Sequence, residues 1–235
     1  MRTYEIGTPV GLARAFVHEA TGRRPRGSRP VVLVLGHGAG GGVQARDLAA
    51  VAARLPARGV TTVLVEQPWR VAGGRVAAAP ARLDRAWAGV LAAPVLADLL
   101  HVEGCRLAVG GRSAGARVAC RTAVATGADL VVCLAFPLHP PGRPERSRVD
   151  ELTGAGLPAL VVQGERDPFG GPAEITAAVL AAGVAGRARP EVVPVPQADH
   201  GFAVPARAEL TQGEALEIVT DAVAGFLLRP AGRAG

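Results

Sequence analysis

Short apolar runs alternate with segments of helical spacing along most of this chain. The clearest run, residues 31–35, reads Val-Val-Leu-Val-Leu, which is typical of a parallel strand buried on both faces. Residues 13–19 are predicted to form an edge strand. Further strands are predicted at 61–65, 106–110, 129–136, 159–163 and 191–195. Helices are predicted at 44–55, at 81–100 with an interruption near Pro94, and at 114–125, 172–182 and 212–228.

Strands and helices that alternate in this way predict an α/β fold, with a mostly parallel central sheet and helices on both of its faces. No repeat or linker divides the chain, and its hydrophobic fraction of 49% is enough for one core. We therefore expect a single domain over residues 1–228 and a flexible tail over 229–235. The connection 137–158 is too short for a full cap domain, so at most the loop 138–148 covers a site there.

The formal net charge of +6 comes from arginines alone, since the chain has no lysine. They are scattered along the sequence without a basic helix or an aromatic platform, which argues against nucleic acid as a partner. The cysteines at 105, 120 and 133 lack metal-ligand spacing and indicate free thiols in a reducing compartment. With neither a secretory signal nor a long apolar span, a cytoplasmic protein without a membrane partner is expected. No metal or cofactor is expected, and the oligomeric state stays open.

One of the three serines, Ser113, lies in the pattern Gly111-Arg-Ser-Ala-Gly115, between a predicted strand and a predicted helix. A strand, a Gly-x-Ser-x-Gly turn and a helix form a nucleophile elbow, in which the serine hydroxyl is exposed on a strained bend. Small residues are needed two positions away on either side, because the bend crowds the backbone. The pattern therefore predicts that Ser113 is a nucleophile.

A serine nucleophile needs a base, and the base works best beside a carboxylate. Strand 159–163 is followed by Asp167, and strand 191–195 is followed by His200, so the order is serine, acid, histidine. Glu165 and Asp199 compete with Asp167 for the role of the acid. Asp199 is poorly placed to face the ring of its own neighbour, and Glu165 lies closer to its strand. Asp167 is therefore the favoured acid.

Two backbone N–H groups are expected to stabilise the oxyanion, one from Ala114 and one from Ala39 in the loop after strand 31–35. His37, Gly38, Gly40, Arg112 and His139 are the candidates for a substrate pocket. His37 is expected mainly to brace its loop, and His139 either lines the pocket or packs within its own loop. For Arg112, Arg117 and Glu66, structural pairing is favoured over contact with a charged substrate.

Several stretches together resemble the α/β-hydrolase superfamily, in particular its compact, dienelactone-hydrolase-like bacterial members. They are His-Gly-Ala-Gly-Gly at 37–41, Gly-Arg-Ser-Ala-Gly at 111–115, Phe-Pro-Leu-His-Pro-Pro-Gly at 136–142, Gly-Glu-Arg-Asp-Pro-Phe at 164–169 and Asp-His-Gly-Phe at 199–202. The resemblance implies a three-layer α/β-hydrolase fold without a full cap domain. It implies a serine hydrolase with Ser113 as nucleophile, Asp167 as acid and His200 as base. The partner would be a small ester, thioester or related acyl substrate, which the resemblance does not identify.

Two alternatives stay open. Gly36-x-Gly38-x-x-Gly41 between a strand and a helix, with Glu66 ending the next strand, also outlines a dinucleotide-binding fingerprint. That reading leaves the serine, the acid and the histidine unexplained. The second alternative is a catalytically silent scaffold that keeps the fold in order to bind partners.

Overall fold

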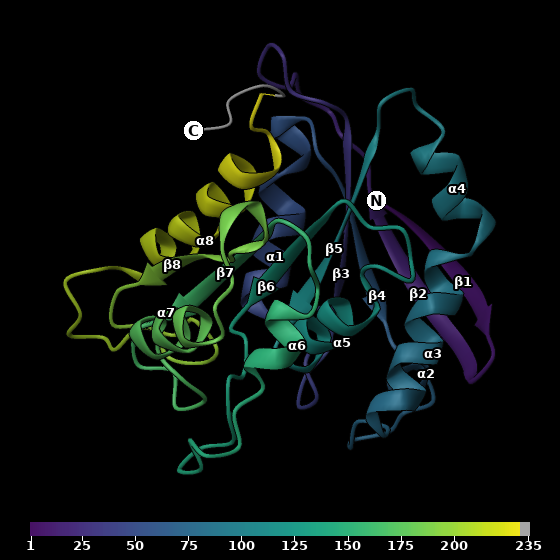
Figure 1. Cartoon of the computed structure of the whole chain (residues 1–235). Coiled ribbons are helices and arrows are strands. Elements are labelled where there is room, and N and C mark those ends of the chain that lie inside the picture. The colour runs from purple at the N-terminus through teal and green to yellow at the C-terminus, as the bar shows by residue number, and fades with distance from the viewer. Residues whose placement is uncertain (231–235) are drawn as a thin grey trace.

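An eight-stranded sheet runs through the middle of the molecule, in the order β1-β2-β4-β3-β5-β6-β7-β8 (Figure 1). A computed structural model provides this description, which covers residues 1–230. Strand β2 is antiparallel to both of its neighbours, β1 and β4. The six strands β3 to β8 are parallel to one another. The strands are β1 (Arg2–Thr8), β2 (Gly11–His18), β3 (Val31–Gly36), β4 (Thr61–Glu66), β5 (Arg106–Arg112), β6 (Leu130–Leu134), β7 (Ala159–Gly164) and β8 (Glu191–Val195).

Helices cover both faces of the sheet, so the predicted three-layer α/β architecture is confirmed. The helices are α1 (Arg46–Arg54), α2 (Pro68–Val71), α3 (Pro80–Leu91), α4 (Pro94–Leu100), α5 (Ala114–Thr122), α6 (Val149–Thr153), α7 (Pro172–Ala181) and α8 (Gln212–Leu227), with 3₁₀ turns at Pro56–Arg58 and Gly186–Ala188. Helices α1 and α8 pack on one face, and α3 to α7 pack on the other. None of the helices within residues 1–230 is both long and apolar enough to cross a membrane.

The uninterrupted apolar run of β3 serves two cores at once. Val32 and Val34 belong to the core under α3 and α5, whereas Leu33 and Leu35 belong to the core under α1 and α8. Successive side chains of a strand point to opposite faces, so a strand between two helical layers needs apolar residues at every position. Gly36 ends this strand opposite Gly111 of β5, and the two loops that follow therefore leave the sheet side by side.

The sequence prediction was wrong at the edge of the sheet. Strand β1 forms the edge, and β2 lies between β1 and β4. Only Ile6 of β1 is buried, so this strand has no apolar run that would reveal it. The interruption predicted near Pro94 within helix 81–100 is confirmed, since α3 ends at Leu91 and Pro94 is the first residue of α4. Of the predicted tail 229–235, Arg229 binds Glu191 through paired hydrogen bonds, and residues 231–235 lie outside the described part of the chain.

Candidate active site

Ser113 occupies a strained turn between β5 and α5, with φ 54° and ψ −114°. Glycines on both sides make this turn sterically feasible. A Cβ on Gly111 would lie 2.5 Å from the carbonyl oxygen of Gly36, and a Cβ on Gly115 would lie 2.4 Å from the same atom. Neither separation is tolerable for real atoms, so the close approach of β3, β5 and α5 requires glycine at both positions.

The loop that carries His200 is pinned against the end of β7. Its backbone adopts positive φ at Gln197 and at Phe202, and the Phe202 ring is fully buried. A Cβ on Gly164 would lie 2.5 Å from the carbonyl oxygen of Ala198, so glycine is needed where this loop meets β7. A buried aromatic anchor and a close backbone contact thus fix the position of the histidine.

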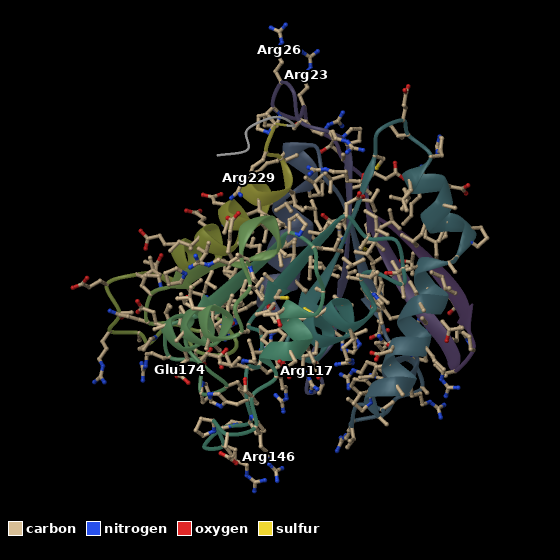
Figure 2. The ribbon with its side chains drawn as sticks, in the orientation of Figure 1. Arg23, Arg26, Arg117, Arg146, Glu174 and Arg229 are labelled. Carbon is tan, nitrogen blue, oxygen red and sulfur yellow. The ribbon has the colours of Figure 1, made fainter. Side chains whose placement is uncertain are left out.

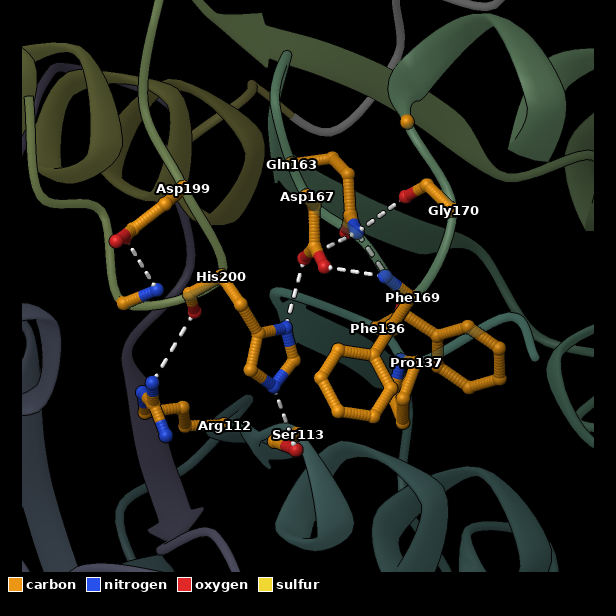
Figure 3. Close-up of polar contacts among 12 residues, drawn as sticks. Arg112, Ser113, Phe136, Pro137, Gln163, Asp167, Phe169, Gly170, Asp199 and His200 are labelled. Atoms are coloured by element: carbon orange, nitrogen blue, oxygen red, sulfur yellow. Dashed lines mark hydrogen bonds and ion pairs between the residues drawn. The ribbon is translucent and has the colours of Figure 1, made fainter. Parts of the chain in front are cut away.

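Figure 3 shows Ser113, His200 and Asp167 in one chain of hydrogen bonds. The Ser113 hydroxyl lies 2.9 Å from His200 Nε2, and His200 Nδ1 lies 2.8 Å from Asp167 Oδ2. Because a carboxylate only accepts, Nδ1 carries the ring proton and Nε2 is free to accept from the serine. The Phe169 ring packs on the imidazole at a centroid distance of 4.3 Å. The structure therefore brings together the three side chains that the sequence analysis singled out.

The Asp167 carboxylate is completely buried and held by further donors. The backbone N–H of Phe169 donates to Oδ1 at 2.9 Å, and the Gln163 amide donates to Oδ2 at 2.8 Å (Figure 3). The same amide nitrogen also faces the carbonyl oxygens of Phe136 at 3.1 Å and Gly170 at 2.8 Å. Gln163 was missed by the sequence analysis, although a glutamine at the end of an apolar strand is a usable signal for a buried polar contact.

Glu165 and Asp199, the two alternative candidates for the acid, hydrogen-bond to backbone groups instead of the His200 ring. Glu165 accepts a hydrogen bond from the backbone N–H of Gln197 at 2.9 Å. Asp199 accepts from the backbone N–H groups of Gly201 at 2.7 Å and Ala203 at 2.9 Å. Both carboxylates therefore brace the histidine loop, and Asp167 is the acid that hydrogen-bonds to the ring.

Arg112 holds the backbone of the histidine rather than its ring. Its Nη2 donates to the carbonyl oxygen of His200 at 3.1 Å, and its Nε lies 3.3 Å from Asp47 Oδ2. The Asp47 side chain, on α1, is completely buried. Burial raises the pKa of Asp47, and the nearby Arg112 charge opposes that rise. Asp47 had no distinguishing pattern in the sequence, because an acidic residue in the first turn of a helix is common.

His37 braces the glycine-rich loop. Its Nδ1 donates to the carbonyl oxygen of Gly38 at 2.9 Å, and its Nε2 accepts from the backbone N–H of Gln67 at 3.1 Å. Burial lowers the pKa of His37, so the ring stays neutral in this arrangement. Gly38 packs directly on the serine turn, where a Cβ would lie 3.0 Å from Arg112 Nη1. Ala39 is exposed at the tip of the loop.

A cleft of about 710 Å³ opens above the serine, and we refer to it as the serine cleft. It is lined by residues 39–41, 45–46, 112–114, Arg117, Pro137, Arg148, Phe169, 199–201 and Ala203. Ala39, Gly40, Ala114 and Arg112 are thus among its walls, whereas His37 and Gly38 are not. The ring of His139 lies elsewhere, with Nε2 3.0 Å from Glu174 Oε2 and Nδ1 3.0 Å from the carbonyl oxygen of Pro140.

Comparison with known proteins agrees with this architecture. A family described as the alpha/beta hydrolase domain matches residues 29–228. A search of curated proteins finds no match to the sequence. Among solved structures, a serine hydrolase without a lid from Xanthomonas campestris is similar with a TM-score of 0.67 and 18% identity, over 97% of this chain and 95% of the other.

Two further structures share the fold. Est1E from Butyrivibrio proteoclasticus has a TM-score of 0.67 and 14% identity, over 97% of this chain and 99% of its own. A dienelactone hydrolase from Anabaena variabilis has a TM-score of 0.62 and 18% identity, over 97% and 98% of the two chains. The family match spans most of the sequence, and the sheet order, the serine turn and the histidine loop are consistent with it. This chain belongs to the alpha/beta hydrolase family.

Proposed function

We propose that the protein is a serine hydrolase that cleaves a small ester, thioester or related acyl substrate. The observation that carries the proposal is the continuous chain of hydrogen bonds from Ser113 through His200 to Asp167, with both distances below 3.0 Å. In many such sites these contacts are long until a ligand binds, so a chain already at hydrogen-bonding distance supports a preorganised catalytic role.

In the proposed reaction the Ser113 hydroxyl attacks the acyl carbonyl while His200 Nε2 takes its proton. A tetrahedral oxyanion forms, and the imidazolium is stabilised by the buried Asp167 carboxylate. His200 then gives the proton to the leaving alcohol or thiol, and the acyl group remains on the serine oxygen. Water attacks this acyl-enzyme with His200 as base, which releases the acid and restores the serine.

The backbone N–H groups of Ala39 and Ala114 are proposed to stabilise the oxyanion. Ala114 is the first residue of α5, and the first N–H groups of a helix have no partner within the helix. Ala39 and Ala114 both line the serine cleft, so both peptide groups border the space where the carbonyl would lie. Fixed donors of this kind stabilise a developing negative charge without reorganisation during the reaction.

The serine cleft favours small or flexible substrates. Among the described residues, the connection between β6 and β7 contributes one short helix, α6, and no cap that would enclose a long acyl chain. Weak promiscuous ester hydrolysis is common on such open sites, so the substrate panel should contain short-chain esters, thioesters and lactones, each measured against the serine variant.

A fluorophosphonate probe tests the nucleophile directly. Wild type is expected to be labelled, and Ser113→Ala is expected to lose both the label and ester hydrolysis. Ser147→Ala is the matched control, because Ser147 is exposed in the loop before α6 and lies outside the serine cleft. Equal labelling of wild type and Ser113→Ala would refute the proposal.

A further inference from the structure

The walls of the serine cleft are rich in arginine. Arg46, Arg112, Arg117 and Arg148 all line it, and Asp199 is the one acidic side chain among the described lining residues. Figure 2 shows Arg117 at the same end of the molecule as Arg146, and Arg23 and Arg26 at the opposite end. The four arginines that line the cleft thus bring their positive charges to one place on the molecule.

Two of these arginines are neutralised by carboxylates. Arg112 lies 3.3 Å from the buried Asp47, as described above. Arg117 donates to Glu151 through Nε at 2.8 Å and Nη2 at 2.6 Å, which is a bidentate pair. Asp199, for its part, is occupied by the backbone N–H groups of its own loop. The pairs account for the charge of two of the four guanidinium groups.

Arg148 lacks such a partner. Its Nη1 donates to the carbonyl oxygen of Pro137 at 2.9 Å, and within residues 1–230 no carboxylate lies within 4.0 Å of its guanidinium. Burial lowers the pKa of Arg148, and the positive charge of Arg117 adds to that effect. Glu151, the acid whose charge opposes this lowering, is already shared by Arg117 and Arg121. Two guanidinium groups therefore share the Glu151 carboxylate, and Arg148 has no ion pair with it, although Arg121 also pairs with Asp84.

We propose that the acyl substrate of this enzyme carries a second, anionic group, a carboxylate or a phosphate, which binds to Arg148 in the serine cleft. This inference rests on the proposed hydrolase function and specifies its substrate class. A half-buried guanidinium without a counter-ion is stabilised when an anion reaches it, and its remaining N–H groups can bind a carboxylate or phosphate in a fork. Arg46 is exposed and hydrogen-bonded to the Gln212 side chain, so its attraction for an anion in the cleft is weaker and is screened by salt.

Matched ester sets test the inference on the purified full-length protein. One set shares the acetyl ester and varies the alcohol: methyl 4-acetoxybenzoate is neutral, 4-acetoxybenzoate carries a carboxylate, and 4-acetoxyphenyl phosphate carries a phosphate. The other set shares 4-nitrophenol and varies the acyl group: 4-nitrophenyl hexanoate is neutral and the 4-nitrophenyl monoester of adipate is anionic. We expect kcat/KM about tenfold higher for an anionic member of at least one set, mainly through a lower KM.

Variants then assign the preference to a residue. Arg148→Gln is expected to reduce the ratio of anionic to neutral kcat/KM to near unity, and Arg148→Lys is expected to keep part of it. Arg146→Gln is the matched control, since Arg146 is exposed in the same loop but does not line the cleft. It should leave the ratio unchanged. Raising the salt concentration should weaken the preference of wild type without any mutation that could disturb folding.

The outcomes separate the two proposals. If neutral esters are hydrolysed through Ser113 at least as efficiently as every anionic member, the anionic subsite is refuted and the hydrolase function stands. A preference that survives in Arg148→Gln also refutes the subsite. If wild type hydrolyses no ester faster than Ser113→Ala does, the hydrolase function itself fails. A preference for the anionic member that is confined to one of the two sets also supports the subsite. It then shows whether the anionic group belongs to the acyl part or to the alcohol part of the substrate.

Discussion

Gln163 is the buried side chain on which the position of the Asp167 carboxylate depends, and Gln163→Met tests this dependence. Methionine has a similar length and volume but no donor. The glutamine nitrogen faces three acceptors, namely Asp167 Oδ2, the Phe136 carbonyl and the Gly170 carbonyl, at 2.8, 3.1 and 2.8 Å. An amide has two N–H hydrogens, so it satisfies two of these acceptors at a time.

The stability change follows from these contacts. Two buried acceptors lose a donor, and each loss costs about 1–2 kcal/mol. The Oε1 atom of Gln163 is buried without a hydrogen-bond partner, so its removal offsets the loss of stability by about 1 kcal/mol. We expect a net destabilisation of about 1–3 kcal/mol, measured by urea unfolding. The Phe169 N–H and the His200 ring still hold the carboxylate, and the variant should therefore fold.

The catalytic change should be separable from the change in stability. Gln163 does not line the serine cleft, so its loss should leave KM unchanged. Without the Gln163 donor the carboxylate is held less firmly against His200 Nδ1, which should lower kcat by about 10- to 100-fold, because small misplacements of catalytic groups have effects of that size. Steady-state kinetics on a short-chain ester measures both parameters, and the rate of fluorophosphonate labelling should fall in parallel with kcat.

Thr220→Val provides the control for a stability loss away from the site. Thr220 is fully buried in α8 and donates to the carbonyl oxygen of Glu217 at 3.1 Å. This variant should also be destabilised but should keep kcat. If kcat of Gln163→Met stays within twofold of wild type, Gln163 does not position the acid and the reasoning is wrong.

Three further predictions address the turn, the loop and the pH dependence. Gly115→Ala should be destabilised by about 3 kcal/mol or more and should lose activity, because its Cβ would lie 2.4 Å from a carbonyl oxygen; near-wild-type stability by urea unfolding would contradict this. Phe202→Ala should cost about 3–5 kcal/mol and slow fluorophosphonate labelling, since the fully buried ring anchors the histidine loop. The pKa of His139 is raised by its hydrogen bond to Glu174, and the pKa of Glu174 is lowered by the same bond. The ordinary pKa values of the two side chains are 4.5 for Glu and 6.5 for His, so the pair stabilises the fold fully between pH 4.5 and pH 6.5. Glu174→Gln should therefore be less stable than wild type by about 0.5 kcal/mol in that window, a small value because the Glu174 side chain is 59% exposed. The difference should shrink as pH rises through the raised pKa of His139, where the Gly171 N–H still favours the Glu174 carboxylate, and it should vanish as pH falls through the lowered pKa of Glu174. A constant difference across the range would exclude the pair as its cause.

Residues at the ends of buried strands were the most predictable part of this protein. The apolar runs identified β3 to β7, because a strand between two helical layers must be apolar on both faces. Strand β8 was also predicted, although it lies at an edge and only Val195 in it is buried. Once those strands were located, their order along the chain indicated which loops share an edge of the sheet. Ser113 was predicted from its Gly-x-Ser-x-Gly turn, and Asp167 and His200 were predicted from the strands that they follow. The structure brings the three side chains together.

Residues whose importance depends on a contact distant in sequence were not predictable. Strand β1 alternates polar residues on an exposed edge, so its pattern resembles a loop. Asp47 on α1 meets Arg112 at the end of β5, and no local pattern links two positions that far apart in sequence. The unpaired charge of Arg148 depends on which partners Glu151 accepts, and that is decided only when α5 and α6 pack. Such features arise from packing, where the sequence pattern carries little information.

The imidazole of His200 is fixed from two independent directions, and this explains how the site can be ordered before any ligand binds. Asp167 holds the ring through Nδ1, and Arg112 holds the backbone through the carbonyl oxygen. Asp167 is itself fixed by the buried Gln163, and Arg112 by the buried Asp47. Buried carboxylates and a turn at positive φ are costly, so the surrounding core must stabilise them. Core substitutions near the ends of β5 and β7 should therefore lower activity and stability together, whereas substitutions on β1 and β2, which lie far from the site in the sheet, should lower stability alone.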